Sequence, residues 1–70
     1  MTPESIRTTL REAREAIGAS QLQVARAMNR RGFRWHQTTV CEKESGRRDI
    51  KVRELCAWLD ALEDCERRAG

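Results

Sequence analysis

Residues 35–48 carry polar side chains that suit hydrogen bonding to the edges of nucleic-acid bases. Gln37 can bond bidentately to adenine, and Thr38 can donate to a base acceptor or pack its methyl group on thymine. Glu42, further along the same segment, can accept from cytosine. We therefore expect Gln37, Thr38 and Glu42 to contact bases. The alternatives are a Gln37 that faces water at a helix start and a Glu42 that pairs with a neighbouring cation.

Basic side chains are concentrated around this polar segment. Residues 30–53 hold eight basic and three acidic side chains, a local excess of five positive charges in a chain whose net charge is +3. Fixed cations bind phosphate, and several such contacts make DNA affinity fall with salt, with a log–log slope of about −4 to −5. The alternative is a solvated basic face without a partner. The arginines that we expect to contact phosphate are Arg30, Arg31, Arg34, Arg47 and Arg48.

The segment that carries the polar side chains is predicted to form a short helix over about 37–45. His36 stands at its N-cap, and Gly46 ends it because glycine readily adopts the left-handed backbone that closes many helices. The basic loop before this helix should be anchored to the core by Trp35. The helix would thus present polar side chains at its start, and the cations Arg47 and Arg48 would lie just beyond its end.

Two helices are predicted before this segment. Apolar residues at steps of four and three predict the first over about 3–17, closed by Gly18. Ser20 and Gln23 have the spacing of a capping box, which predicts the start of a second helix that fades near Asn29. Their expected inward faces are Ile6, Leu10, Ala13 and Ile17 in the first, and Val24, Ala25 and Met28 in the second.

A fourth helix is predicted from about residue 52 to residue 62, and the charged tail over 63–70 is expected to fray. Trp58 has two possible roles, which are packing against the first helix and contact with another subunit. We favour packing. The inward stripe predicted for this helix is Val52, Leu55, Leu59 and Leu62. The candidates for a subunit contact are Leu22, Trp58, Ala61, Leu62 and Cys65.

Five groups of residues occur in an order that is typical of one family of DNA-binding domains. They are Leu10-x-x-Ala13-Arg14, Gly18-x-Ser20-Gln21-x-x-Val24-Ala25, Gln37-x-Thr39-Val40, Glu44-x-Gly46-x-Arg48, and Leu55 to Leu62. Together they resemble the helix-turn-helix domain of lambda-repressor-like regulators, also called the Cro-type or XRE family. The resemblance implies a compact, all-α, four-helix fold whose third helix, about 37–45, enters the major groove of DNA.

The resemblance also implies roles for four residues outside the base-reading positions. Gln21 falls where the family holds a phosphate at the first turn of the second helix, whose positive end supports that role. Thr39 is expected to brace the start of the third helix or to contact phosphate. Arg14 and Glu44 match an ion pair that links the first helix to the end of the third and so orients it.

Three features depart from the family pattern. The stretch from Gln21 to Gln37 spans sixteen positions, which is longer than in compact forms of the family, and it supplies extra arginines. Lys43 occupies a position that is usually apolar, so we expect its stem to run along the edge of the core. The fifth helix that often forms the dimer contact is not expected, so a homodimer on a palindromic site would need another face.

Length and composition exclude several classes of protein. Seventy residues suffice for one small domain over 1–70, with its core over about 3–62. No apolar run approaches the ~20 residues of a membrane span and no signal-peptide pattern is present, so we expect a cytoplasmic protein. Three cysteines without metal-ligand spacing predict reduced thiols, no metal and no cofactor. One histidine and no phosphate-cradling glycine loop argue against an enzyme or a small-molecule site.

The sequence therefore predicts a sequence-specific, double-stranded DNA-binding transcriptional regulator. Its small size suits a Cro-like repressor encoded by a phage or mobile element. The alternative is a protein–protein interaction module, antitoxin- or antirepressor-like, that keeps the same fold without reading DNA. Salt-dependent binding to duplex DNA separates the two functions.

Overall fold

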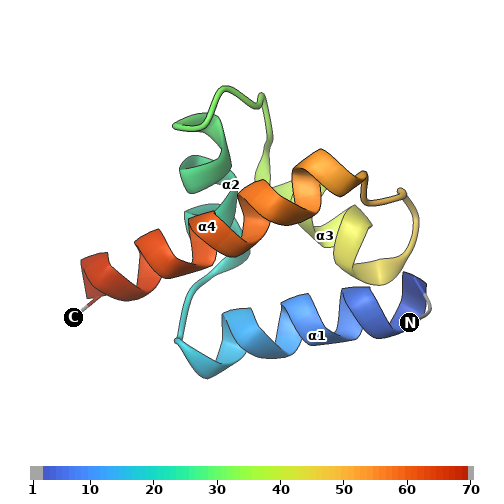
Figure 1. Cartoon of the computed structure of the whole chain (residues 1–70), viewed down its shortest axis with the longest axis horizontal. Coiled ribbons are helices and arrows are strands. Elements are labelled where there is room, and N and C mark those ends of the chain that lie inside the picture. Colours follow the sequence, from blue (N-terminus) through green and yellow to red (C-terminus); the bar gives the residue numbers. More distant parts are fainter. Residues whose placement is uncertain (1–2, 70) are drawn as a thin grey trace.

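Four α-helices make up the regular structure of the protein, in a computed structural model that describes residues 3–69 (Figure 1). They are α1 (Pro3–Ala16), α2 (Gln21–Asn29), α3 (Gln37–Ser45) and α4 (Val52–Ala69). No strand occurs among the described residues, so the predicted all-α, four-helix fold class is confirmed.

Local sequence sets the ends of α2 and α3. The N–H of Gln23 donates to the Ser20 hydroxyl at 3.0 Å, and the N–H of Ser20 donates to the Gln23 side chain at 2.7 Å, which completes the predicted capping box. At the start of α3, the N–H of His36 donates to the Thr39 hydroxyl at 3.3 Å. Gly46 ends α3 with a φ of 88°, in the left-handed region that favours glycine.

The core is formed where α2 packs against both α3 and α4, while α1 packs against the same two helices. Trp35, in the loop between α2 and α3, lies edge to face against Trp58 of α4, with 5.5 Å between the ring centroids. This contact anchors the long loop to the core, as the sequence predicts. The largest fully buried side chains are Leu10, Val24, Met28, Val40 and Trp58.

The predicted inward stripe of α4 is wrong in two of its four positions. Val52 is 79% exposed and Leu59 is 50% exposed, because α4 is rotated so that Trp58 is buried against Trp35. Burial of the large indole outweighs burial of a valine or a leucine. Trp58 therefore packs within its own chain, as the favoured interpretation expects, and is too deeply buried for the alternative role in a subunit contact. The side chains of α4 that are buried are Glu54, Trp58, Ala61, Leu62 and Cys65.

The charged tail is helical rather than frayed over residues 63–69, since α4 continues to Ala69, and Gly70 lies outside the described residues. Cys65 is buried, and its thiol lies 3.7 Å from the backbone oxygen of Gln23 in α2. The preceding Asp64 carboxylate accepts a hydrogen bond of 2.7 Å from Arg30. These contacts hold the last turns of α4 against α2, so the core extends beyond residue 62.

Candidate nucleic-acid interface

One side of α3 faces outward and carries only polar side chains and a thiol. Gln37 and Thr38 are exposed at its first turn, and Glu42 is half-buried one turn later. Cys41 and Ser45 are also exposed on this face, although neither is among the predicted site residues. The spacing of four residues from Gln37 to Cys41 to Ser45 places them on one side of a helix, so the periodicity alone could have found them.

A buried ion pair fixes the opposite side of α3 to α1. The Arg14 guanidinium donates to both carboxylate oxygens of Glu44, at 2.7 and 3.0 Å, and also to the backbone oxygen of Ala19 at 3.0 Å. The side chains of Arg14 and Glu44 are 12% and 4% exposed. A carboxylate near a helix C-terminus is unfavourable by itself, and the bidentate arginine offsets that cost. The pair implied by the resemblance therefore forms and joins α1 to α3.

Gln21 completes this network. Its side-chain amide donates to Glu44 at 3.1 Å, so one of the donors that the sequence analysis assigns to phosphate is directed into the protein. Gln21 thus helps to position α3. Thr39, which is expected either to brace the start of α3 or to contact phosphate, uses its hydroxyl to brace that start.

A second buried ion pair ties α3 to α4. Lys43 Nζ lies 3.0 Å from Glu54 Oε1 and 2.9 Å from the backbone oxygen of Asp49, and it sits 5.3 Å from the centre of the Trp35 ring. The sequence predicts that the Lys43 stem runs along the edge of the core. In the structure Lys43 lies within the core, where it is 5% exposed. A lysine is tolerated there because its charge is paired and hydrogen-bonded.

The pKa of Glu54 reflects two opposing effects. Burial raises it, but the hydrogen bond from the Lys51 N–H and the hydrogen bond and charge of Lys43 outweigh burial, so the pKa lies below its usual value. Glu54 is consequently charged at neutral pH. Its carboxylate both pairs with Lys43 and caps the first turn of α4.

Three arginines gather where α3 ends. Arg47 and Arg48 are exposed, as predicted, and Arg48 lies 3.8 Å from Glu42. The third is Arg7 of α1, which the sequence analysis missed; a Cβ added at Gly46 would lie 2.9 Å from its guanidinium carbon. Nothing in the local sequence around Arg7 indicates this position, because the contact depends on how α1 packs against α3. The cluster places three guanidinium groups beside the end of α3, next to the carboxylates of Glu42 and Asp49.

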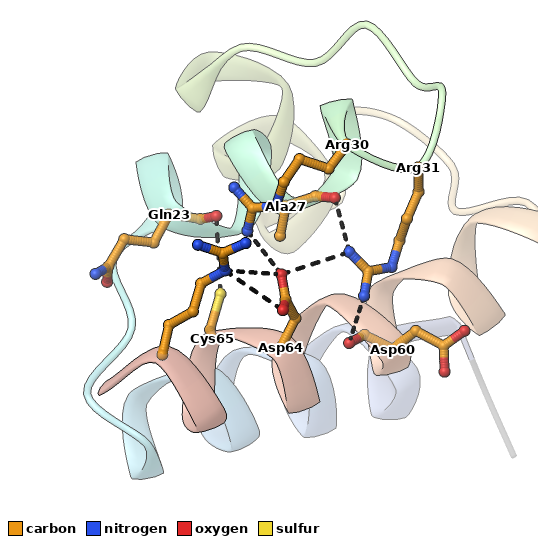
Figure 2. Close-up of polar contacts among 8 residues, drawn as sticks. Gln23, Ala27, Arg30, Arg31, Asp60, Asp64 and Cys65 are labelled. Atoms are coloured by element: carbon orange, nitrogen blue, oxygen red, sulfur yellow. Dashed lines mark hydrogen bonds and ion pairs between the residues drawn. The ribbon is translucent and has the colours of Figure 1, made fainter. Parts of the chain in front are cut away.

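The arginines of the loop before α3 divide into two groups. Arg34 is exposed, as the prediction of a phosphate contact requires. Arg30 and Arg31, in contrast, turn toward α4 (Figure 2). Arg30 donates to Asp64 at 2.7 Å, and Arg31 donates to the backbone oxygen of Asp60 at 3.1 Å and to that of Ala27 at 3.0 Å. These two guanidinium groups thus help to pack the loop and α2 onto α4, and the donors used there are not free for the predicted phosphate contact.

Asp64 is the common acceptor of this second cluster. Hydrogen bonds from Arg30 and then from Arg68 lower its pKa, against the opposing effect of burial. Burial, followed by the charge of Asp64, raises the pKa of the adjacent Cys65 thiol, so this cysteine is neutral at pH 7.

Models of protein families, curated proteins and solved structures give no match to this chain. The assignment of function therefore rests on the geometry described above. None of the helices in residues 3–69 is long and apolar enough to cross a membrane. Within the same range no three His, Cys, Asp or Glu side chains are placed to hold a metal ion, and the three cysteines are free thiols.

Proposed function

We propose that the protein is a DNA-binding transcriptional regulator of the helix-turn-helix type and that α3 enters the major groove. The observation that carries the proposal is the outward face of α3, which carries polar side chains and the Cys41 thiol and is held in place by two buried ion pairs on its inner side. A major groove about 12 Å wide admits a helix, and a reading helix must be both exposed and rigidly oriented. The resemblance of Arg14, Gln21 and Glu44 to the lambda-repressor-like family supports the same proposal.

The side chains on this face fit the two tasks of such a helix. Gln37 and Thr38 would read base edges at the first turn, and Glu42 would accept from cytosine. Arg47 and Arg48 would grip phosphates on one flank. Arg7, which lies against the end of α3, adds a third cation to that flank.

Selection of bound sequences from a random duplex library is the direct test of this proposal. We expect an enriched motif and an affinity that falls steeply with salt. A dissociation constant weaker than about 10⁻⁴ M for every duplex at low salt would rule the proposal out.

Replacing Gln37 by alanine is expected to relax the sequence preference while leaving nonspecific affinity nearly unchanged. The reason is that a bidentate contact to one base pair discriminates by about 1–3 kcal/mol, or roughly ten- to a hundred-fold. The measurement is a comparison of affinities for the selected motif and for single-base variants of it. An equal loss of affinity for every duplex would mean that Gln37 contacts the phosphate backbone of the DNA.

Replacing Arg47 by alanine is expected to weaken binding to all sequences equally and to reduce the magnitude of the salt slope by about 1. The matched control is Arg67→Ala, which removes another exposed arginine, at the far end of α4. Titrations between 50 and 200 mM salt measure both variants. If Arg67→Ala changes the slope as much as Arg47→Ala does, the phosphate contacts are not localised near the end of α3.

A protein-interaction module is the second candidate function. It is favoured by the half-buried Glu42 carboxylate on the outward face of α3, which would repel a nearby phosphate, and by the pairing of Arg30 and Arg31 within the chain. These contacts leave fewer cations for DNA than the sequence suggests. The salt titration decides between the two functions, since only DNA binding requires the release of several counterions.

A further inference from the structure

A small pocket between α2 and α4 is lined by three arginines. Its volume is about 210 Å³, and its lining comes from α2, from the residue that caps the end of α2, and from the last turns of α4. The lining residues are Gln23, Arg26, Arg30, Cys65 and Arg68. Their steps of three and four on α2, and of three on α4, place each set on one side of its helix. None of these residues belongs to α3, so the pocket is distinct from the candidate nucleic-acid interface.

Among the described residues, Asp64 supplies the one carboxylate that pairs with the arginines of this pocket. It accepts a hydrogen bond of 2.7 Å from Arg30, and Arg31 lies 3.7 Å from it (Figure 2). Its hydrogen bonds from Arg68 are longer, at 3.3 and 3.4 Å. Three guanidinium groups therefore share one negative charge, and an anion that entered the pocket would reduce the repulsion among them.

The acidic groups nearest to Asp64 along α4 do not pair with these arginines in the described part of the chain. Figure 2 shows the Asp60 carboxylate directed away from the cluster, while the backbone oxygen of Asp60 accepts from Arg31. Glu63 and Glu66 are exposed and lie one residue before and two residues after Asp64, so the helical period places them on other sides of α4. The pocket therefore keeps a net positive charge, which attracts anions.

Most of the guanidinium donors of the pocket have no acceptor within residues 3–69. Arg26 is exposed and forms no hydrogen bond or ion pair in that range. Arg30 donates through Nη2 alone and Arg68 through Nε alone, and their side chains are 41% and 63% exposed. A guanidinium group presents its N–H donors in a planar fork that fits two oxygens of one phosphate. The donors that remain can therefore bind an oxyanion that enters from solvent.

We propose that this pocket binds a tetrahedral oxyanion, a phosphate dianion carried by inorganic phosphate or by a small phosphate monoester. Arg26 donates to it from α2, Arg30 from the end of α2, and Arg68 from α4. The pocket is smaller than the roughly 300–1,000 Å³ of sites for drug-sized ligands, so it admits a phosphate group but not a whole nucleotide. The inference rests on α2 and α4 and does not depend on DNA binding by α3.

Titration of the DNA-free full chain with sodium phosphate, at constant ionic strength, tests the proposal. The NMR signals of the arginine Nε–H groups and of the Cys65 backbone amide report on the pocket. We expect saturable shifts with a dissociation constant of roughly 1 mM, the affinity that a few charge-assisted hydrogen bonds would give. A parallel titration with phosphoserine, whose phosphate is mostly the dianion at about pH 7.5, shows which source of the dianion binds more tightly.

Substitutions inside and outside the pocket provide matched comparisons. Arg26→Gln and Arg68→Gln should each weaken phosphate binding about ten-fold. The control Arg67→Gln removes an exposed arginine outside the lining and should change the dissociation constant by less than about two-fold. Asp64→Asn removes the competing carboxylate and should tighten binding about five-fold, a gain that a purely structural cluster would not give. An unchanged Tm confirms that each variant is folded.

A phosphate titration that does not saturate would overturn the proposal. So would equal losses in Arg26→Gln and Arg67→Gln, or weaker binding by folded Asp64→Asn. Duplex DNA separates this pocket from the candidate nucleic-acid interface, because Arg26→Gln should leave the salt slope of duplex binding unchanged while Arg47→Ala reduces its magnitude by about 1. A reduced slope in Arg26→Gln would show that the pocket contacts the DNA backbone instead. A failed phosphate titration leaves the DNA-binding proposal untouched, because no DNA is present in it.

Discussion

Replacing Arg14 by methionine is expected to lower the free energy of unfolding by about 3–5 kcal/mol, because it leaves the buried Glu44 carboxylate without its bidentate partner. The Glu44 side chain is only 4% exposed and would keep just the hydrogen bond from Gln21. A chain of this length has a total stability of roughly 4–10 kcal/mol, so a large fraction of the variant should be unfolded at 25 °C. Urea denaturation followed by tryptophan fluorescence measures the loss.

Arg11→Met is the matched control for this substitution. Arg11 lies on the same helix, but its contact with Glu15 is 3.8 Å long and both side chains are more than half exposed, so the loss should stay below about 0.5 kcal/mol. Replacing Arg14 and Glu44 together by methionine should recover most of the stability, since an apolar pair of similar volume replaces a buried ion pair at little cost. Equal losses for Arg11→Met and Arg14→Met would show that the Arg14–Glu44 pair is not a stabilising contact.

The features that the sequence predicts correctly are those that depend on neighbours along the chain or on a strong residue-type constraint. Ser20 and Gln23 are three residues apart and cap each other, and Gly46 alone tolerates the backbone that ends α3. The Arg14–Glu44 pair spans thirty positions, and the resemblance to a known family, not local spacing, implied it. Within the candidate site, the exposure of Gln37 and Thr38 could be predicted, because the helical period of α3 places both on its outward face.

The features that the sequence does not predict depend on contacts between distant segments. Two faces of α4 have helical spacing of apolar residues, and the choice between them is decided by Trp58, which packs against Trp35 from a separate loop. Arg30 meets Asp64 thirty-four positions away, and a free arginine in a loop gives no sign of that partner. Composition alone cannot distinguish arginines that are paired within the protein from arginines that are available to bind phosphate.

Lys43→Met is expected to destabilise the protein at pH 7 by about 3–5 kcal/mol, for a reason that pH can test. The substitution removes the ammonium group that lies 3.0 Å from Glu54, while both side chains are less than 10% exposed. The methionine fills most of the space of the lysine stem and packs beside Trp35, so little of the loss should come from a cavity. The loss should come mainly from a buried carboxylate that retains only the N–H of Lys51.

The pH dependence of this loss follows from the pKa of Glu54 in each protein. In the wild type the pKa lies below the usual 4.5, so the contribution of Glu54 to stability is complete above that pH and is lost as the pH falls through the lower, folded-state pKa. Without Lys43, burial is opposed by a single hydrogen bond, and the pKa should move upward. As the pH falls, protonation of Glu54 would then neutralise the unpaired carboxylate and reduce the destabilisation of the variant, while the wild type loses stability. The difference between the two proteins should therefore shrink steadily from pH 7 to pH 4.

Two variants separate this explanation from a general effect of lost charge. Lys51→Met removes an exposed ammonium group but keeps the backbone N–H that donates to Glu54, so it should cost little at any pH. Lys43→Met combined with Glu54→Gln replaces the stranded carboxylate by a neutral amide, which should recover part of the stability and remove the titration of residue 54 from the variant. The difference from the wild type should then change only where the wild type itself loses the contribution of Glu54, as the pH falls through its lowered pKa. A Lys43→Met deficit that is the same at pH 7 and pH 4 would mean that the lysine acts through packing on Trp35 and not through its charge.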